Sequence, residues 1–264
     1  MKRAIGLAAL TVLELPHAEQ VSVAAQAGYT HVGLRIVPVA GQPFNHPFDV
    51  AEVERRLADT GVSVLDVEVL RLTPDTEVGQ FRPAMEAAAR LRASELLVHG
   101  ADPDHARLVD SFGRLCDLAA GYGLSVNLEP MPWVEVSNVD QALRILEAAG
   151  RGNGALLVDA IHFFRGGDRV RALGEVPRRY LRYAQLCDAP AERPAQMQEI
   201  IRQARADRLF PGEGGLDLKG LLRALPAAIP ISVEIPVSQP LSALERARRA
   251  LAATRAILRA VEET

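Results

Sequence analysis

The sequence predicts an α/β protein that folds as a single-domain (β/α)8 TIM barrel. Short apolar runs recur along the chain, and a helical pattern of apolar residues follows each of them. Most runs begin about 30 residues after the previous one, which is the length of one strand, one helix and two loops. With 264 residues, the chain has the size of one such barrel and can bury a large core. We therefore expect one domain over residues 1–264.

Eight apolar runs are candidate strands. Their nearly continuous hydrophobicity is typical of a parallel sheet that is covered by helices. They span residues 4–10, 31–36, 62–70, 95–100, 124–130, 154–159, 181–188 and 230–236. The alternative architecture is an open, doubly wound sheet. Eight strands favour closure, and no Gly-x-Gly-x-x-Gly motif follows the first run.

Capping residues mark the helices between these runs. Asp49, with an acidic residue three positions later, is typical of an N-cap, and Gly61 is expected to end that helix. Asn138 is expected to cap the helix that follows the fifth run. Residues 242–263 carry apolar residues at helical spacing and are expected to form the last helix.

The connection before the eighth run is unusually long. It contains helical segments at 194–205 and 217–225, with a glycine-rich stretch at 209–215 between them. Long connections in compact barrels usually cover an active site. The glycine-rich stretch lacks the Lys-Ser/Thr ending of a phosphate-binding loop, so we expect its glycines to turn the backbone tightly over the pocket.

Composition narrows the classes of protein to consider. Hydrophobic residues make up 48% and charged residues 24% of the chain, and a net charge of −3 provides no basic excess for binding nucleic acid. Two cysteines are too few for a disulfide framework and favour a cytoplasmic location. The apolar N-terminal run lacks a signal-peptide cleavage site, and no run approaches the ~18 residues of a membrane span. We therefore expect a small-molecule substrate and neither a nucleic-acid nor a membrane partner.

Four runs carry an acid or an amide near the carboxyl end, although the interior of a barrel is normally branched and apolar. These residues are Glu129, Asp159, Gln185 and Glu234. Because side chains alternate along a strand, each run directs one of them inward at the same end of the barrel. Burying three carboxylates in one cavity is costly unless a cation joins them. The four residues therefore predict a site for one divalent metal ion. Its all-oxygen shell suits Mg²⁺ or Mn²⁺, with Co²⁺ and Zn²⁺ as alternatives.

The motifs around these residues resemble the xylose isomerase-like TIM barrel superfamily, in particular its sugar phosphate isomerase and epimerase family. The resemblance covers nearly the whole chain. It rests on Asn-Leu-Glu-Pro (127–130), Asp-Ala-Ile-His (159–162), Gln-Leu-Cys-Asp-Ala-Pro (185–190), Phe-Pro-Gly-Glu-Gly (210–214) and Val-Glu (233–234). It implies that the four residues named above bind the metal. The family usually has a histidine where this chain has Gln185, and the glutamine is similar to the 3-dehydroshikimate dehydratase branch.

The resemblance also implies that Glu129 and Glu234 are the catalytic pair. In the epimerases, one glutamate removes a proton from the carbon next to a carbonyl, and the other returns it. A metal bound to carbonyl and hydroxyl oxygens stabilises the charge that develops. We therefore expect a metal-dependent isomerase or epimerase of a small sugar or polyhydroxy carbonyl compound. The alternative is a lyase of the 3-dehydroshikimate dehydratase type, which begins in the same way and then expels a β-hydroxyl.

Three residues near the strand ends are candidates for binding substrate. His162 is expected to hydrogen-bond a substrate hydroxyl, and Arg193 to meet a substrate oxygen or carboxylate. Arg35, at the end of the second run, is expected to bind an anionic group. The alternative for each is a purely structural role.

Three other residues are expected to line the pocket. Glu68 and His99 end the third and fourth runs and are expected to face the substrate or to hydrogen-bond the metal ligands. Trp133, the only tryptophan, is expected to wall one side by stacking on a ring or sugar face. Structural packing is again the alternative.

Two further functions share this fold. The branch of apurinic-site endonucleases resembles proteins with a three-metal site that is rich in histidine. In this chain only two of the six histidines lie near predicted strand ends. A non-catalytic metabolite-binding barrel would keep the pocket without needing a metal. The family resemblance implies a homodimer or a homotetramer, and the sequence leaves the substrate open, including whether it is phosphorylated.

Overall fold

The strands of the computed structural model, which describes residues 3–39, 41 and 44–263, close into a barrel. Each strand pairs in parallel with the next, and β8 pairs with β1 to complete the ring. The strands are β1 Ile5–Leu7, β2 His31–Arg35, β3 Ser63–Leu72, β4 Glu95–Gly100, β5 Ser125–Leu128, β6 Gly154–Asp159, β7 Leu181–Leu186 and β8 Ile231–Val233. The prediction of a (β/α)8 TIM barrel is confirmed, and the open sheet is wrong.

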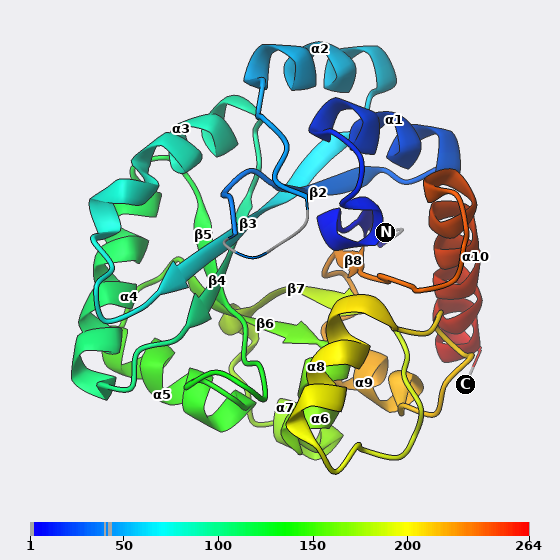
Figure 1. Cartoon of the computed structure of the whole chain (residues 1–264). Coiled ribbons are helices and arrows are strands. Elements are labelled where there is room, and N and C mark those ends of the chain that lie inside the picture. The colour runs from blue at the N-terminus through cyan, green and yellow to red at the C-terminus, as the bar shows by residue number, and fades with distance from the viewer. Residues whose placement is uncertain (1–2, 40, 42–43, 264) are drawn as a thin grey trace.

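Helices surround the barrel, as Figure 1 shows. They are α1 His17–Ala27, α2 Val50–Thr60, α3 Arg82–Arg90, α4 His105–Ala120, α5 Val139–Ala149, α6 Ala160–Gly166, α7 Val170–Leu173, α8 Met197–Ala206, α9 Leu218–Ala224 and α10 Ala243–Glu262. Short 3-10 segments lie at Ala9–Val12, Val78–Phe81 and Arg178–Tyr180. The last helix, α10, packs against α1 and α9 and completes the outer ring. In the part of the chain described, no helix is both long and apolar enough to cross a membrane.

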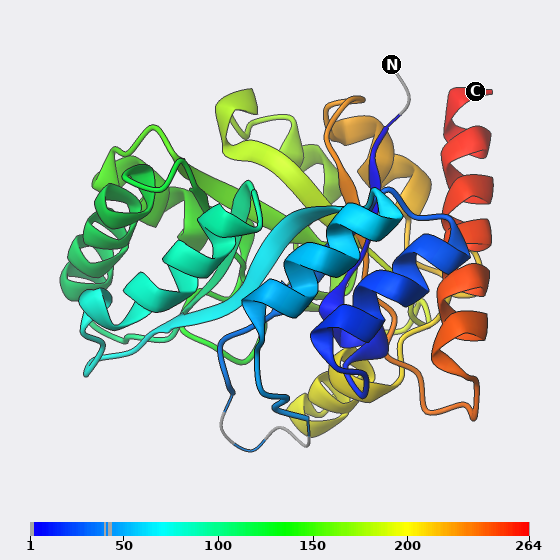
Figure 2. The ribbon, with the colours of Figure 1, turned by 90° about the horizontal axis from the view of Figure 1, so that it is seen from above.

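The predicted caps are present. The side chain of Asp49 accepts hydrogen bonds from the first turn of α2, and Gly61 ends that helix in a left-handed conformation with φ of 70°. Asn138 accepts from the backbone N–H of Gln141 and caps α5. Figure 2 shows the chain termini on one side of the barrel, whereas α8 and the β2–α2 connection lie on the opposite side, at the carboxyl ends of the strands.

The fifth and eighth strands are shorter than predicted, which moves two important glutamates beyond the sheet. Glu129 and Glu234 each follow the last residue of a strand, and prolines 130 and 236 lie close behind them. Because proline has no N–H, it cannot extend a strand ladder. The two glutamates are nevertheless held by their neighbours. The N–H of Glu129 donates to the carbonyl of Val98 (2.9 Å), and that of Glu234 to the carbonyl of Leu186 (3.2 Å).

Irregular pairing of β3 brings an acid into the barrel interior. Residues Val32 and Leu34 of β2 pair with Val64 and Val67 of β3, so β3 has one extra residue at this point. A Cβ added to Gly33 would lie 2.8 Å from Oδ1 of Asp66, which shows that this carboxyl group crosses over the glycine. Such a bulge redirects a side chain that strict alternation would place elsewhere.

The glycine-rich stretch is organised by Asp188 and does not line the pocket, contrary to our expectation. The carboxylate of Asp188 accepts hydrogen bonds from the backbone N–H groups of Gly212 (2.9 Å), Gly214 (3.0 Å) and Leu216 (3.1 Å). The pocket is lined instead by residues that precede this stretch, Ala204, Arg205 and Arg208. The long connection therefore does reach the pocket, but through α8 and the residues that follow it.

Substitution of Gly214 tests this arrangement. A Cβ at Gly214 would lie 2.3 Å from both the carbonyl oxygen of Ala189 and Oδ1 of Asp188, so the backbone must shift. We expect Gly214→Ala to lower the free energy of unfolding by about 1–3 kcal/mol in urea titrations. Gly152→Ala, where a Cβ meets nothing within 4 Å, is the control. Equal stability of the two variants would contradict the close packing of Gly214 on Asp188.

Candidate functional site

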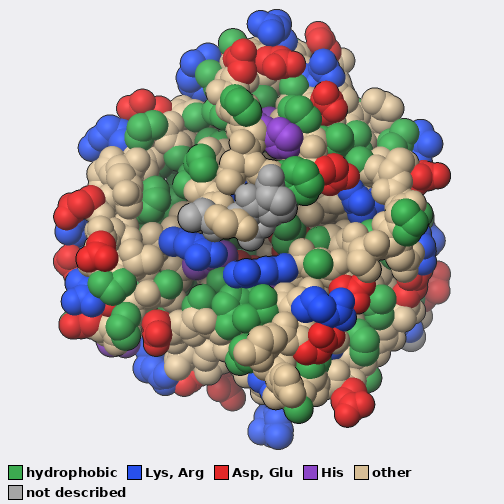
Figure 3. Space-filling view, viewed as in Figure 1, with side chains coloured by type: hydrophobic (Ala, Val, Ile, Leu, Met, Phe, Trp, Pro, Cys, Tyr) green, Lys and Arg blue, Asp and Glu red, His purple; other side chains and the backbone are tan. Residues whose placement is uncertain are grey.

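A pocket opens at the carboxyl ends of the strands. Val39 of the β2–α2 connection, Ala204 of α8 and three buried acids, Glu68, Glu129 and Glu234, line it. Basic side chains gather near the centre of this face, as Figure 3 shows. The pocket therefore combines buried acids with a basic entrance, at the end of the barrel where such folds carry their active sites.

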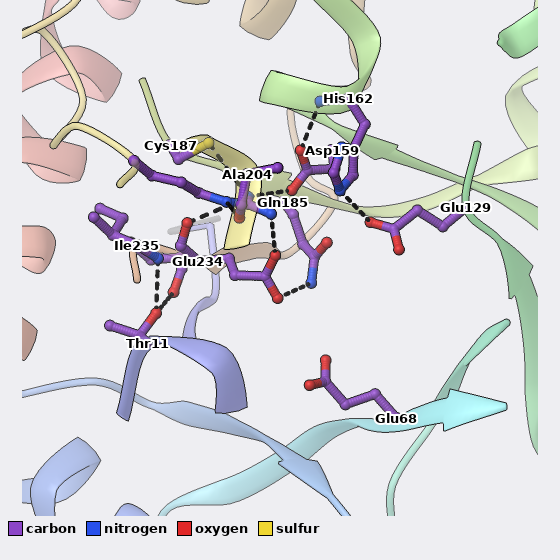
Figure 4. Close-up of polar contacts among 12 residues, drawn as sticks. Thr11, Glu68, Glu129, Asp159, His162, Gln185, Cys187, Ala204, Glu234 and Ile235 are labelled. Atoms are coloured by element: carbon purple, nitrogen blue, oxygen red, sulfur yellow. Dashed lines mark hydrogen bonds and ion pairs between the residues drawn. The ribbon is translucent and has the colours of Figure 1, made fainter. Parts of the chain in front are cut away.

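The four predicted ligands meet at this end of the barrel. Glu129 and Glu234 line the pocket, while Asp159 and Gln185 are buried on the paired strands β6 and β7. The amide nitrogen of Gln185 donates to Oε1 of Glu234 (3.2 Å; Figure 4). Among the described residues, Oε1 of Gln185 has no hydrogen-bond partner. A buried amide oxygen without a partner is the kind of atom that a cation would satisfy.

Arg208, which the sequence did not predict as a site residue, bridges two of these acids. Its Nη1 lies 2.7 Å from Oδ2 of Asp159, and its Nη2 lies 2.7 Å from Oε2 of Glu234. Its side chain is 1% exposed. Burial opposes the charged state, but Asp159 and Glu234 keep the pKa of Arg208 well above its usual value. A guanidinium therefore supplies part of the positive charge that we expected a metal to supply.

Glu129 is held by histidines rather than by arginine. Its Oε2 shares a hydrogen bond with Nε2 of His99 (2.6 Å), and Nε2 of His162 lies 3.9 Å from its other oxygen. Burial, followed by the charges of Asp159 and Glu234, raises the pKa of Glu129 well above the usual value. Burial lowers the pKa of His162 to about 4, so its imidazole is neutral at physiological pH. A neutral imidazole is the form that binds metals.

Three residues here can hold a metal ion. Ligand atoms of Glu129, Asp159 and His162 all lie within 4.8 Å of one another. Asp159 also caps α6, because its Oδ1 accepts from the backbone N–H of His162 (3.0 Å), and this fixes the two residues relative to each other. This group shares only Glu129 and Asp159 with the predicted ligand set. His162, which we predicted as a substrate contact, is a further candidate ligand, and the predicted set of four stays a prediction.

Glu68, on β3, lies apart from the other acids labelled in Figure 4. Its Oε1 accepts from Nη2 of Arg35 (2.8 Å), and within the described part of the chain its Oε2 has no partner. The sequence predicted that Glu68 and Arg35 line the pocket, and both do. Because Arg35 is paired with Glu68, it is less available to bind an anion than we expected.

The remaining predicted contacts divide into two groups. His99, His162 and Trp133 line the pocket, and the ring of Trp133 meets that of His162 edge-on, with centroids 5.0 Å apart. Arg193 does not line the pocket, and its Nε donates to the carbonyl of Arg165 (2.7 Å) at the end of α6. Its predicted role in substrate binding therefore has no support from its position.

Two further arginines line the pocket and were missed by the sequence analysis. Arg71 follows the residue at which we expected β3 to end, and Arg205 lies in the last turn of α8, over the ring of Trp133 at 5.7 Å. Of the acids that the structure describes, none forms an ion pair with either arginine. Arg71, Arg205 and Arg35 line the same pocket, and burial followed by the charges of Arg205 and Arg35 lowers the pKa of Arg71. They form the basic entrance of the pocket.

Asp66 lies in the barrel interior and has no contact that would stabilise its charge. It is 0% exposed, and neither carboxyl oxygen has a hydrogen-bond partner among the residues described. Burial, followed by the charges of Glu68 and Glu234, raises its pKa well above the usual value. We therefore expect Asp66 to be protonated in the folded chain near neutral pH.

This gives a pH dependence that can be measured. Because the pKa of Asp66 is higher in the folded chain than in the unfolded chain, its contribution to stability is present at low pH and is lost as the pH rises above about 4. We expect Asp66→Asn to reduce this loss, by up to ~1.4 kcal/mol per pH unit, in urea unfolding between pH 5 and pH 7. Asp59→Asn, on the exposed face of α2, controls for the loss of one acid. Identical pH slopes for wild type and Asp66→Asn would contradict the assignment.

A closed barrel that gathers carboxylates and imidazoles around one pocket at its strand ends defines a class of proteins that bind and transform small molecules. Within this class, the chain belongs to the family described as xylose isomerase-like TIM barrel, which matches residues 21–257. The family resemblance predicted from the motifs is therefore confirmed.

The curated relatives that match this chain are named for two different activities. The chain is 29% identical over 124 residues to a 3-dehydroshikimate dehydratase of Pseudomonas aeruginosa, covering 47% of this chain and 19% of that protein. It is 31% identical over 113 residues to an inosose isomerase of Bacillus velezensis, covering 42% of this chain and 38% of that protein. The matched segments thus span well under half of the length of these relatives.

Solved structures share the fold. The IOLI protein with a binding zinc atom has a TM-score of 0.82 and 18% identity, covering 98% of this chain and 99% of that chain. A xylose isomerase-like TIM barrel/4-hydroxyphenylpyruvate dioxygenase fusion protein has a TM-score of 0.83 and 20% identity, covering all of this chain and 44% of that one. A D-allulose 3-epimerase from Methylomonas sp. has a TM-score of 0.72 and 19% identity, and covers 97% of each chain. The curated relatives are thus named for a dehydratase and an isomerase activity, and the solved structures share the fold of this chain.

Proposed function

We propose that this protein is a divalent-metal-dependent dehydratase that acts on a small polyhydroxy carbonyl compound bearing a carboxylate, such as 3-dehydroshikimate. The observation that carries the proposal is the pair of pocket arginines, Arg71 and Arg205, for which no described acid is an ion-pair partner. Guanidinium groups at a pocket entrance that have no acidic partner among the described residues favour an anionic substrate group. The similarity to 3-dehydroshikimate dehydratase and the glutamine at position 185 point in the same direction.

The residues present fit a divalent cation. Gln185 offers an oxygen that no described residue satisfies, and Glu129, Asp159 and His162 offer grouped ligand atoms. A cation held there would stabilise negative charge that develops on substrate oxygens. The oxygen-rich donor set favours Mn²⁺ or Mg²⁺, while an imidazole among the ligands would also suit Zn²⁺ or Co²⁺.

The two glutamates can then move the protons. Burial raises the pKa of Glu234 to about 7, with Arg208 opposing, so this carboxyl group can exchange a proton near neutral pH. Glu129 faces the same space and is oriented by His99. One glutamate takes the proton next to the carbonyl, the carbon–oxygen bond at the β position breaks, and the hydroxyl leaves as water with a proton from the other.

Isomerisation or epimerisation is the second candidate. It needs the same pair of glutamates, with the second returning the proton to carbon instead of to a leaving hydroxyl. The relatives named inosose isomerase favour it. A neutral sugar would leave Arg71 and Arg205 without a role in binding, which is why we place the dehydratase first.

Metal removal and Glu129→Gln test the reaction. We expect the purified protein to convert 3-dehydroshikimate into an unsaturated product, followed by absorbance, and to lose this activity with a chelator and regain it with Mn²⁺. Glu129→Gln removes a proton carrier and should lower kcat by at least ~100-fold. Glu147→Gln, on the exposed side of α5, is the control. Full turnover after complete metal removal would refute the mechanism, and proton exchange on neutral ketoses without elimination would favour the isomerase.

A substitution at the pocket entrance tests whether the substrate carries a negative charge. We expect Arg205→Gln to raise KM for a carboxylated substrate by roughly 10- to 100-fold, because an ionic hydrogen bond contributes about 1.5–3 kcal/mol. The kcat should change less, since Arg205 forms no ion pair with the glutamates that move protons. Arg248→Gln, on the exposed face of α10, is the control. An unchanged KM, or a preference for neutral sugars in wild type, would count against the carboxylate.

A further inference from the structure

Arg208 is fixed in one orientation by the protein alone. Its Nε donates to the carbonyl of Ala204 (2.7 Å), and its two terminal nitrogens reach Asp159 and Glu234. The backbone is held as well, because the N–H of Arg208 donates to the carbonyl of Pro236 (3.0 Å) and the next residue, Leu209, bridges to Asp188. The guanidinium is therefore a built part of the site and not a mobile side chain that reaches in from the surface.

The contacts of Arg208 leave part of each carboxylate available. It contacts Oδ2 of Asp159 and Oε2 of Glu234, whereas Oδ1 of Asp159 accepts from a backbone N–H and Oε1 of Glu234 accepts from Gln185. One oxygen of each acid is thus outside the reach of the guanidinium. A ligand atom of Asp159 lies within 4.8 Å of ligand atoms of Glu129 and His162, so a second cation can bind there without displacing the arginine.

The net charge of the three buried acids and Arg208 matches that of a divalent cation. Glu129, Asp159 and Glu234 carry three negative charges when ionised, and Arg208 carries one positive charge. A divalent ion would therefore make the buried group neutral, and a buried group without net charge avoids most of the desolvation cost. Without the ion, Asp159 and Glu234 still have Arg208 as a partner, and Glu129 has its hydrogen bond with His99.

We propose that Arg208 is a permanent counter-cation of the metal site, which holds Asp159 and Glu234 in their binding positions before a divalent ion arrives and lowers the affinity of the site for that ion. The inference rests on the metal-dependent function proposed above and extends it to how the site is assembled. Arg208 is a positioning residue, because it acts through the two acids.

Arg208→Gln in the full-length protein tests this role, with Arg246→Gln as the matched control. Arg246 is also a buried arginine that pairs with a carboxylate, Glu14, and with a backbone carbonyl, but it contacts none of the expected ligands. Melting temperatures are measured in EDTA and in Mn²⁺, and Mn²⁺ is titrated into the metal-free proteins. We expect both variants to melt below wild type in EDTA. Only Arg208→Gln should show a larger Mn²⁺-induced rise in melting temperature than wild type.

Affinity gives the second readout. We expect Arg208→Gln to bind Mn²⁺ about tenfold or more tightly than wild type, because a neighbouring guanidinium no longer repels the dication. Arg246→Gln should keep the wild-type Kd. Equal or weaker Mn²⁺ binding by Arg208→Gln, or the same Mn²⁺-induced shift as in the control, overturns the proposal. If either result is found while the wild-type enzyme still needs Mn²⁺ for turnover, this inference is overturned and the proposed function remains in place.

A folding defect would still be informative. If Arg208→Gln is unfolded in EDTA and recovers its circular dichroism spectrum in Mn²⁺, the ion has replaced the counter-cation, which supports the proposal. If Arg208→Gln stays unfolded both in EDTA and in Mn²⁺, the same measurements are made on the variant Arg208→Lys. A lysine keeps the charge but lacks the planar fork that spans both acids. We then expect a lower melting temperature in EDTA with a Mn²⁺ Kd within about threefold of wild type, and a wild-type melting temperature would overturn the proposal.

Discussion

Burial of three carboxylates at one end of the barrel is the constraint on which the rest of the site depends. Glu129, Asp159 and Glu234 are each at most 4% exposed, and ionised acids in such surroundings destabilise a fold unless positive charge offsets them. Arg208 supplies one such charge by contacting two of the three acids. The position of α8, the course of the residues after it and the antiparallel bridge between Asp188 and Leu209 all serve to keep that guanidinium in place.

The pocket divides into two electrostatic regions with different roles. Its interior is lined by acids and imidazoles, and behind them the buried Gln185 has an amide oxygen for which no described residue is a partner; together these groups suit a divalent cation. Its entrance carries Arg71 and Arg205, which suit an anion. A substrate with oxygens at one end and a carboxylate at the other would match both regions at once. This pairing of regions, more than any single residue, favours an acidic substrate over a neutral sugar.

The irregularities of β3 show how local backbone geometry changes what a barrel interior contains. One extra residue opposite Gly33 places the carboxyl group of Asp66 over the glycine. The pairing of β3 with β4 also shifts in register, between Val67 and Leu70. Simple alternation of side chains cannot predict either shift, because a bulge depends on how two strands pair and not on the pattern within one of them. The same limit applies to Arg71, which lies beyond the expected end of the strand.

By itself, the sequence determined the barrel, the order of its strands and the end at which polar residues gather. Those features follow from the periodicity of apolar residues and from local signals such as the caps Asp49 and Asn138, which depend only on neighbours in the chain. It also indicated Glu129, Asp159, Gln185 and Glu234, because polar residues at strand ends stand out from apolar surroundings. Only the tertiary structure decided what surrounds them. Arg208 meets Asp159 across 49 positions of the chain, and Arg193 turns away from the pocket to the end of α6. Contacts of that kind arise from the closure of the barrel and the packing of its longest connection, for which a single sequence carries no local signal.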